Sequence, residues 1–583
     1  MFKKGSLFVL VLLASFLFFS CGGGEVADDG EQAPEPSFSV RMVEHNCVNN
    51  TINSYSIKNL TSITFMLIKG ETEVVYKKTI SIYNGTIESS VKLKGIPKES
   101  DLTLTILGYG ANPNLAYWFG KVSGLDFVTT PQTSIDVVLY PTKDFYSENN
   151  LAINTACLPQ GLLTPRFGHS ATLLKDNRIL IAGGFTGCNS GKCPATKSVE
   201  VLDLESGTVE QLCDMAEERG MHEAVLLRDG SVLMVGGVHG FGIRSLVVDD
   251  SIPTVADFPS LTYGTMSAAM KIERYTPSYP NHNMHQNGLE IEVDNITQEV
   301  YSSQQLPFAR LQSIIVKTVT TPEQEDTGEP RRIMIYLAGG IDSSNTPLTT
   351  VSRIEVIDNS LIDGTVSIGE VKEFASDAEL AAVMPALGFS GNDLLIVGGR
   401  SDSAASQAML VDSSTGKITD HPISGDKNVF FSKPVSANNS VYMFGGYEST
   451  SEGLLPTNRI RRWTSETVQT SSGDLKLWNK TDGTLAFPEI VFNENILMVI
   501  GGAGGSSKDD TNIVHGNKIF QTYDASTLDL KQASNTHFAR IMSKSVIVPA
   551  GVIASSPVLV ITGGTTAFDG TGTVIDAVEF MNL

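Results

Sequence analysis

Seven Gly-Gly doublets, each closing a short apolar run, divide the chain after residue 150. The runs read ILIAGG, VLMVGG, IYLAGG, LLIVGG, VYMFGG, LMVIGG and LVITGG. One pattern repeated at intervals near this length is typical of propellers and solenoids. The apolar runs predict strands that are buried on both faces, and the glycines allow positive φ where each strand ends.

The first unit divides into four short strands, here named a to d, which read HSATLL, ILIAGG, VEVLD and TVEQL. Arg166 and Arg219 stand 17 residues before the first glycine of their doublets, and His169 and His222 stand 14 before it. This arrangement resembles the kelch repeat. The resemblance implies an all-β fold in which residues 150–583 form a seven-bladed kelch-type β-propeller.

Two features of the predicted ring of blades depart from the simple repeat: a long insertion and a closing strand from the start of the segment. The second and third doublets lie 103 residues apart, which indicates a long insertion from Val238 to Gly288 rather than an eighth blade. One c–d hairpin, from Leu289 to Leu306, is expected after it. Residues 150–154 are expected to supply the fourth strand of the last blade and to leave no open sheet edge.

The N-terminus carries a targeting segment. Lys3-Lys4, the apolar stretch from Leu7 to Phe19 and the sequence FFSCG are similar to a bacterial lipoprotein signal. The resemblance implies a signal peptide over residues 1–20, a lipid anchor on Cys21 and an outer-membrane or cell-surface address. An ordinary secretory signal is the alternative. Residues 21–37 predict a flexible acidic tether.

Residues 38–145 contain runs of alternating apolar and polar residues, among them SITFMLIK and DLTLTILGY. This period favours antiparallel strands in a β-sandwich. The segment resembles the small immunoglobulin-like or transthyretin-like modules of bacterial surface proteins. A stalk and a binding module are the two roles that the pattern leaves open.

Charge and cysteines narrow the function further. The net charge of −22 opposes binding to nucleic acid, which requires a basic surface. An exported compartment permits disulfides, and Cys188 with Cys193 forms the favoured pair, with metal binding as the alternative. Cys47 with Cys157 is a weaker candidate pair, which leaves Cys213. No metal or cofactor is expected.

Blade geometry places the b–c and d–a connections on one face of the disc. Arginine offers a rigid fork of donors that suits carboxylates, so Arg and His in these connections form a candidate site for an acidic sugar or acidic peptide. Hydrogen bonds that tie neighbouring blades together are the alternative role. The candidate ligand-binding residues are Arg166, His169, Arg219, His222, Arg310 and Arg540.

The sequence therefore predicts an exported lipoprotein whose propeller binds protein or carbohydrate through its b–c/d–a face. A sugar-modifying enzyme similar to kelch-fold sialic-acid epimerases and a structural envelope scaffold are the alternatives. Copper oxidases resembling galactose oxidase share the kelch propeller and use a Tyr-His dipeptide as metal ligands. No Tyr-His dipeptide occurs in this chain, so that activity is not expected.

Overall fold

The computed structural model is all-β. The residues it describes are 37–44, 60–70, 73–82, 90–110, 116–129, 134–141, 155–157, 161–189, 192–205, 207–242, 272–276, 290–293, 314–321, 324, 328–340, 348–363, 365–380, 385–399, 407–422, 429–430, 432, 434–450, 453–457, 459–464, 468–474, 485–504, 515–553, 557–567 and 572–583. They form strands β1 to β41 and one short 3-10 helix, η4 (Ala378–Leu380). No helix in this described part is long and apolar enough to cross a membrane.

The N-terminal part forms one seven-stranded sheet with the order β3-β2-β5-β6-β7-β1-β4. Phe38 of β1 and Phe65 of β2 are buried in the same core, so the sheet curls until distant strands share one interior. β1 pairs with β7 in parallel and with β4 antiparallel. The strands are β1 (Ser37–Glu44), β2 (Ser62–Lys69), β3 (Glu73–Ser81), β4 (Ser90–Lys94), β5 (Leu102–Tyr109), β6 (Ala116–Leu125) and β7 (Ser134–Pro141).

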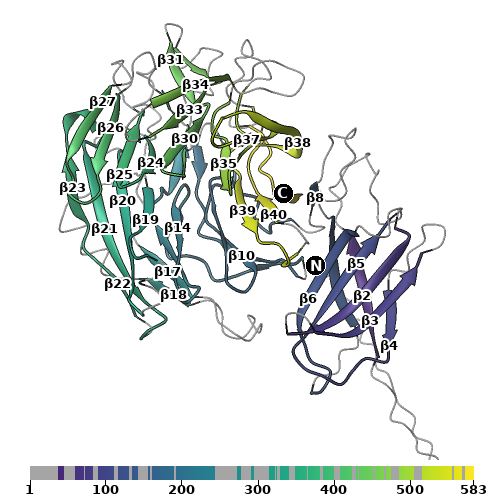
Figure 1. The fold of residues 1–583 in the computed structure, drawn as a ribbon. Coiled ribbons are helices and arrows are strands. Elements are labelled where there is room, and N and C mark those ends of the chain that lie inside the picture. Colours follow the sequence, from purple (N-terminus) through teal and green to yellow (C-terminus); the bar gives the residue numbers. More distant parts are fainter. Residues whose placement is uncertain are drawn as a thin grey trace, which may run out of the picture.

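The rest of the described chain contains seven antiparallel sheets, named sheets 1 to 7 in chain order (Figure 1). Each has four strands in the order a-b-c-d, and sheet 3 has a fifth, β23 (Lys372–Ser376), which pairs with β21. Sheets 1 to 3 consist of β9 (Ser170–Leu173), β10 (Arg178–Ala182), β12 (Val199–Asp203) and β13 (Val209–Gln211); β14 (Glu223–Leu226), β15 (Val232–Val235), β17 (Glu273–Thr276) and β18 (Glu290–Val293); and β19 (Ile314–Thr318), β20 (Arg331–Ala338), β21 (Thr350–Asn359) and β22 (Thr365–Ile368).

Sheets 4 to 7 repeat the same order. They consist of β24 (Ala386–Ser390), β25 (Asp393–Val397), β26 (Gln407–Asp412) and β27 (Ile418–Pro422); β29 (Pro434–Ala437), β30 (Ser440–Phe444), β33 (Arg459–Trp463) and β34 (Val468–Asp474); β35 (Glu489–Asn493), β36 (Ile496–Ile500), β37 (Asn517–Asp524) and β38 (Leu530–Arg540); and β39 (Lys544–Val548), β40 (Val558–Thr562), β41 (Val578–Asn582) and β8 (Thr155–Cys157).

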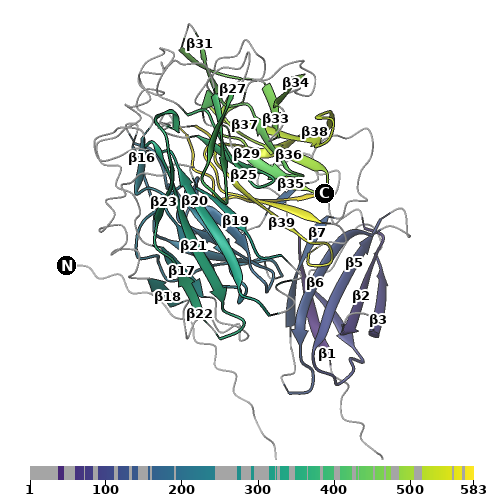
Figure 2. The same ribbon diagram turned by 60° about the vertical axis from the view of Figure 1, so that its left-hand side comes forward.

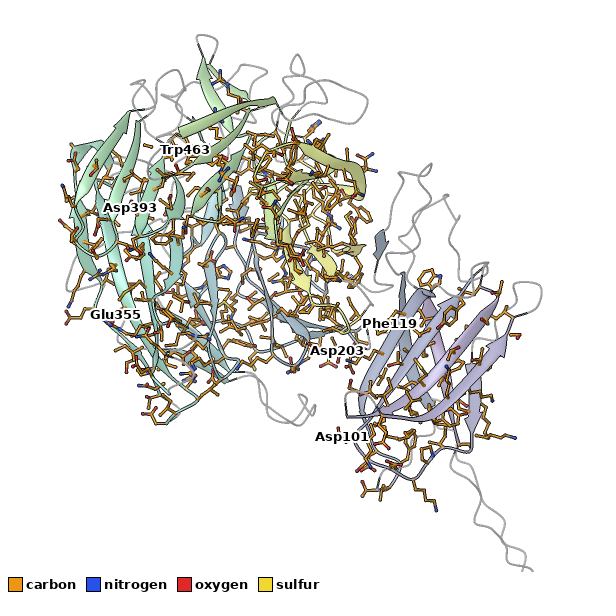
Figure 3. The ribbon with its side chains drawn as sticks, in the orientation of Figure 1. Asp101, Phe119, Asp203, Glu355, Asp393 and Trp463 are labelled. Atoms are coloured by element: carbon orange, nitrogen blue, oxygen red, sulfur yellow. A yellow bond between two sulfur atoms is a disulfide. The ribbon has the colours of Figure 1, made fainter. Side chains whose placement is uncertain are left out.

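The b strands form the interior between neighbouring sheets. Every residue of β10, β15, β30 and β40 is buried, because each strand packs a sheet on both faces. Ile181 packs toward sheet 7, whereas Leu180 packs toward sheet 2. Trp463 of β33 lies in such a layer between sheets 4 and 5 and is 1% exposed (Figure 3).

The a strands follow one another around a common centre. β9 contacts β14, and the same neighbour relation continues through β19, β24, β29 and β35 to β39, which contacts β9 again. Figure 1 shows β14, β19, β24, β35 and β39 on the inner side of the group of sheets, and Figure 2 shows the same group turned by 60°. The residues at the start of each a strand are therefore brought together from points far apart in the sequence.

Two sequence expectations need correction here. Strand c of sheet 2 is β17, which lies inside the segment 238–288 that was expected to be a single insertion, and β18 is strand d. Leu289 to Leu306 is therefore not the c–d hairpin of that unit. The closing strand of sheet 7 is β8, which begins just after the expected residues 150–154 and pairs with β41.

Two smaller sheets extend from the end of the sheets at which the doublets lie. β11 (Lys192–Pro194) pairs with β16 (Gly240–Gly242), and β31 (Tyr447–Thr450) pairs with β28 (Val429–Phe430) and β32 (Gly453–Pro456). They are built from b–c and d–a connections, so both additional sheets lie on this face.

The N-terminal sheet touches the opposite end. Lys121 Nζ on β6 donates to the Gly551 carbonyl over 2.9 Å, and the Ser123 backbone N–H donates to Glu205 Oε2 over 3.0 Å. Gly551 belongs to the a–b turn of sheet 7 and Glu205 to the c–d turn of sheet 1. Figure 3 labels Phe119 of β6 and Asp203 of β12 on the two sides of this contact. These contacts of the N-terminal sheet therefore lie at the end opposite the doublets.

Candidate functional site

The glycine doublets join neighbouring sheets at this face. The backbone N–H of Gly184 in sheet 1 donates to the Arg219 carbonyl over 2.8 Å, and Gly564 in sheet 7 donates to the Arg166 carbonyl over 2.8 Å. All seven doublets have positive φ. A Cβ on Gly184 would lie 2.8 Å from the Phe167 carbonyl oxygen, so both backbone conformation and space require glycine there.

The side chain of Arg166 makes all its hydrogen bonds within its own sheet and connector. Its Nε donates to the Thr164 carbonyl over 3.0 Å, and its Nη1 donates to the carbonyls of Gly183 and Ser198 over 2.9 Å each. Its Nη2 donates to Ser198 Oγ and to Glu200 Oε1. These bonds account for all five guanidinium N–H groups.

Two further Arg–Glu pairs repeat this arrangement. Arg219 Nη2 donates to Glu273 Oε1 over 2.7 Å, and Arg540 Nη2 donates to Glu579 Oε1 over 2.7 Å. Both side chains of each pair are 0% exposed. Each glutamate also accepts backbone N–H groups of the d–a connector, as Glu273 does from Ala216 over 2.7 Å.

The histidines link neighbouring sheets. His169 Nε2 lies 2.8 Å from Thr562 Oγ1 of sheet 7, and His222 Nε2 lies 2.9 Å from Ser170 Oγ of sheet 1. Burial is the first cause that holds the pKa of each imidazole well below its usual range, and the neighbouring Arg166 and Arg219 charges add to it. Both rings are therefore neutral around pH 7 and serve as hydrogen-bonding ties.

Five of the six candidate ligand-binding residues are thus placed. Arg166, Arg219, Arg540 and His169 are 0% exposed, so a ligand cannot reach their polar atoms without opening the sheets. This burial argues against direct ligand contact by these four residues and fits the alternative role of tying the repeats together. His222 is 3% exposed and lines the cavity described below. Arg310 and the lipidation candidate Cys21 lie outside the described residues.

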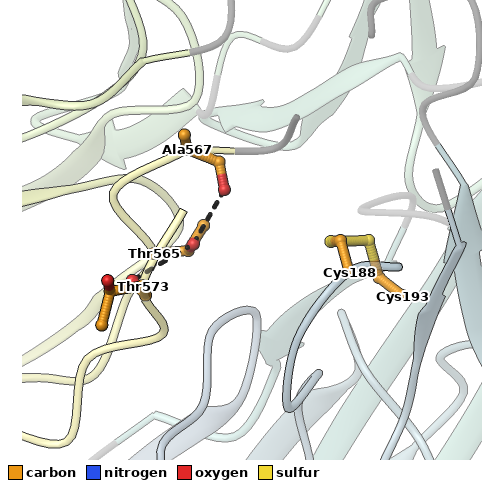
Figure 4. Close-up of a disulfide and its surroundings, with 5 residues drawn as sticks. All are labelled: Cys188, Cys193, Thr565, Ala567 and Thr573. Carbon is orange, nitrogen blue, oxygen red and sulfur yellow. Dashed lines mark hydrogen bonds between the residues drawn. A yellow bond between two sulfur atoms is a disulfide. The ribbon is translucent and has the colours of Figure 1, made fainter. Parts of the chain in front are cut away.

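Cys188 and Cys193 form the predicted disulfide (Figure 4). It closes the b–c connection of sheet 1 beside β11, and Figure 4 shows it across from the b–c connection of sheet 7, where Thr565 Oγ1 donates to the Ala567 carbonyl over 2.9 Å. Among the described side chains, Cys213 is a free, exposed thiol. Cys47 and the side chain of Cys157 lie outside the description.

A cavity of about 340 Å³ lies where the a strands meet, and the sequence reasoning missed it. Its wall is formed by residues of sheets 2 to 7, by the turns before their a strands and by the turn before the a strand of sheet 1. The described lining residues are Gly168, Met221, His222, Glu223, Ile314, Ile315, Val316, Leu387, Phe389, Ser432, Pro434, Val435, Ser436, Phe487, Pro488, Glu489, Met542, Ser543 and Lys544.

Three charged side chains enter the cavity wall at one level. Glu223, Glu489 and Lys544 each begin an a strand and pair with the residue directly before the glycine doublet of their sheet. Equivalent register places them at the same height in three different sheets. Glu489 is 6% exposed, whereas Glu223 and Lys544 are half-buried.

The turn before each of these strands is held in a left-handed conformation. Met221, Phe487 and Met542 have φ of 55°, 51° and 55°, and Gly168 occupies the same place in sheet 1 with φ of 61°. Positive φ is costly for residues with side chains and persists where surrounding structure imposes it. Backbone bonds run from turn to turn: Gly168 N–H donates to the Met542 carbonyl over 2.9 Å, and Met221 N–H donates to the Gly168 carbonyl over 2.7 Å. The side chains of Met221, Phe487 and Met542 line the cavity and are largely buried.

A sequence signal for these residues exists, although it is weak. Glu223 directly follows His222 in the recognisable Arg/His motif, and Lys544 stands four residues after Arg540. Glu489 has no such guide, because its connector contains Leu485 where sheets 1, 2 and 7 have arginine. Register within the repeat, rather than residue type, identifies the three positions.

Among the described residues there is no group of three or more His, Cys, Asp or Glu side chains that could hold a metal ion. The polar groups on the described cavity wall are instead two carboxylates, one ammonium, an imidazole and serine hydroxyls. Such a set can bind a small polar molecule through charge-assisted hydrogen bonds.

No protein-family model matches this chain, and no curated protein matches it in sequence. Among solved structures, it is similar to a fungal alcohol oxidase of the AA5 family in complex with copper. The two chains are 11% identical, the TM-score is 0.42, and the match covers 74% of this chain and 77% of the oxidase.

Proposed function

We propose that this protein is an exported lipoprotein whose seven sheets are the blades of a kelch-type propeller that binds carbohydrate. The observation that carries the proposal is the cavity at the meeting point of the a strands. Its volume of about 340 Å³ falls in the range of sites for small molecules, which are typically mostly apolar with a few converging polar groups.

The face on which the cavity lies supports this role. The disulfide-closed connection and the two additional small sheets are on the same face, and the N-terminal sheet contacts the opposite one. An N-terminal β-sandwich that serves as a stalk, with a lipid on Cys21, would then hold the binding face away from the membrane. This arrangement suits a receptor for molecules outside the cell.

A sugar-modifying activity is the second candidate, and one observation favours it. Glu223 and Glu489 belong to different sheets but line the same cavity. Paired carboxylates with different surroundings are a frequent source of general acid and base groups. Turnover of a bound sugar would identify an enzyme, and binding without turnover would identify a receptor.

The test is a glycan-array measurement with residues 22–583 and a variant that fills the cavity. Ser436 lines the cavity and is exposed to it, so Ser436→Trp is expected to abolish glycan binding. Leu361→Trp, at a 58% exposed position on the opposite turns of sheet 3, is the matched control and is expected to bind normally. Glycan binding that survives Ser436→Trp would contradict the cavity as the site, and no binding by the parent chain would contradict the function.

A further inference from the structure

The cavity carries more negative than positive charge. Two carboxylates, of Glu223 and Glu489, and one ammonium, of Lys544, occupy equivalent starts of a strands. These three are the charged groups among the described lining residues. His222 is neutral around pH 7, because burial lowers the pKa of its imidazole well below the usual value. The net charge on the described wall is therefore −1, whatever contacts these groups make with their neighbours.

The arginines do not reverse this balance. The three repeated guanidinium groups of Arg166, Arg219 and Arg540 are fully buried and neutralised one for one by Glu200, Glu273 and Glu579. An acidic ligand would have to displace those bonds to gain an arginine contact. The sequence pattern alone favours an acidic ligand on an arginine ring, whereas the arrangement of charges favours the opposite sign.

The remaining wall suits a compact cation with apolar faces. Phe487 lines the wall with an aromatic ring, and Met221 and Met542 line it with polarisable thioethers from the rim turns. The ring of Phe389 already has Lys317 Nζ 4.9 Å from its centroid. Aromatic faces attract cations and also pack against the C–H face of a sugar ring. Ser436 adds an exposed hydroxyl that can bond to a sugar hydroxyl, whereas Ser432 and Ser543 are buried.

We propose that the ligand of this cavity is a sugar that carries a free amino group, with its ammonium held by Glu223 and Glu489. The inference rests on the proposed carbohydrate-binding function and adds the chemical class of the sugar. It differs from the sequence expectation of an acidic sugar in the sign of the charge that is recognised.

The test compares three sugars that share one ring. Calorimetric titration of residues 22–583 with glucosamine, N-acetylglucosamine and glucose at neutral pH varies the charge while it keeps the pyranose. Glucosamine is expected to bind at least about ten-fold more tightly than the other two, the range of a hydrogen bond between charged groups. Glucuronate serves as the acidic comparison and is expected to bind least.

Variants separate charge from shape. Glu223→Gln and Glu489→Gln keep the side-chain volume and are each expected to weaken glucosamine binding by about ten-fold, whereas glucose binding stays unchanged. Glu355→Gln, on the exposed outer part of sheet 3, is the matched control without effect. Thermal unfolding checks that each variant is folded. If Glu489→Gln does not fold, the half-buried Glu223 carries the test.

Lys544→Met is expected to change the affinity for glucosamine in the opposite direction from the glutamate variants, or to leave it unchanged. An ammonium ligand loses a repelling charge and binds as tightly or more tightly, whereas an anionic ligand loses its partner. Stronger binding of N-acetylglucosamine, glucose or glucuronate than of glucosamine would overturn the amino-sugar inference and leave carbohydrate binding intact. Absence of binding by all four sugars, together with an empty glycan array, would overturn both.

Discussion

The buried Arg166–Glu200 pair leads to a quantitative prediction for Glu200→Gln. Glu200 accepts the Leu163 and Thr164 backbone N–H groups over 2.8 Å each, as well as the Arg166 guanidinium. Glutamine keeps the size, but it removes the negative charge and turns one acceptor oxygen into a donor that faces a donor. A buried guanidinium then lacks its counter-charge in a region where water does not enter.

The magnitude follows from this burial. Removing one partner of a buried ion pair costs about 3–5 kcal/mol, and exposed pairs contribute about 0–1 kcal/mol. The exposed pair of Arg332 and Glu355 is the internal control, because its side chains are 52% and 37% exposed and Glu355 also belongs to a c strand (Figure 3). Glu200→Gln is therefore expected to lower the free energy of unfolding several times more than Glu355→Gln.

Urea denaturation, followed by the fluorescence of the tryptophans, which include the buried Trp463, measures both losses. The double variant Arg166→Met/Glu200→Met closes a double-mutant cycle, and it is expected to cost less than the sum of the single changes because no unpaired charge remains. Equal losses for Glu200→Gln and Glu355→Gln, or strictly additive single and double changes, would refute this reasoning.

Two further predictions concern the histidine ties and the glycine doublets. Folding holds the pKa of His169 and His222 well below the value of about 6.5 in the unfolded chain. The contribution of these rings to the free energy of unfolding is therefore constant above that pH, and below it the contribution falls by about 1.4 kcal/mol per pH unit for each ring. The double variant His169→Gln/His222→Gln should show a shallower pH slope in urea titrations at pH 7.5 and 5.5, and an unchanged slope would argue against neutral buried rings. Gly183→Ala places a Cβ against the Arg219 carbonyl oxygen at a φ of 61° and should lower the free energy of unfolding by about 2 kcal/mol or more. Gly328→Ala, at a φ of 83° with open space around it, should lower it by about 1 kcal/mol. Equal shifts of the thermal midpoint in the two variants would contradict the role of the inter-sheet contact.

Periodicity in the sequence predicted the strands well where the repeat is regular. Strands β9, β10, β12 and β13 fall on the four segments read from the first unit, because apolar runs, turn residues and the doublet all act locally. Strand β17 was missed because its short run, ERYT, stands between long connections and no doublet marks it. Which distant strand completes sheet 7 depends on closure in three dimensions, so the sequence placed it a few residues too early.

The candidate site was harder to predict for a physical reason that concerns the repeat itself. Where arginine and histidine recur at one repeat position, as Arg166 and His169 do, they make the bonds that hold one sheet to itself and to its neighbour. The position directly after the histidine varies more from sheet to sheet. It holds serine in sheet 1, glutamate in sheets 2 and 6, alanine in sheet 4 and lysine in sheet 7. Ser170 and Ala386 are buried between neighbouring sheets, whereas Glu223, Glu489 and Lys544 line the cavity. Specificity in such a fold is therefore expected at the residues that break the repeat.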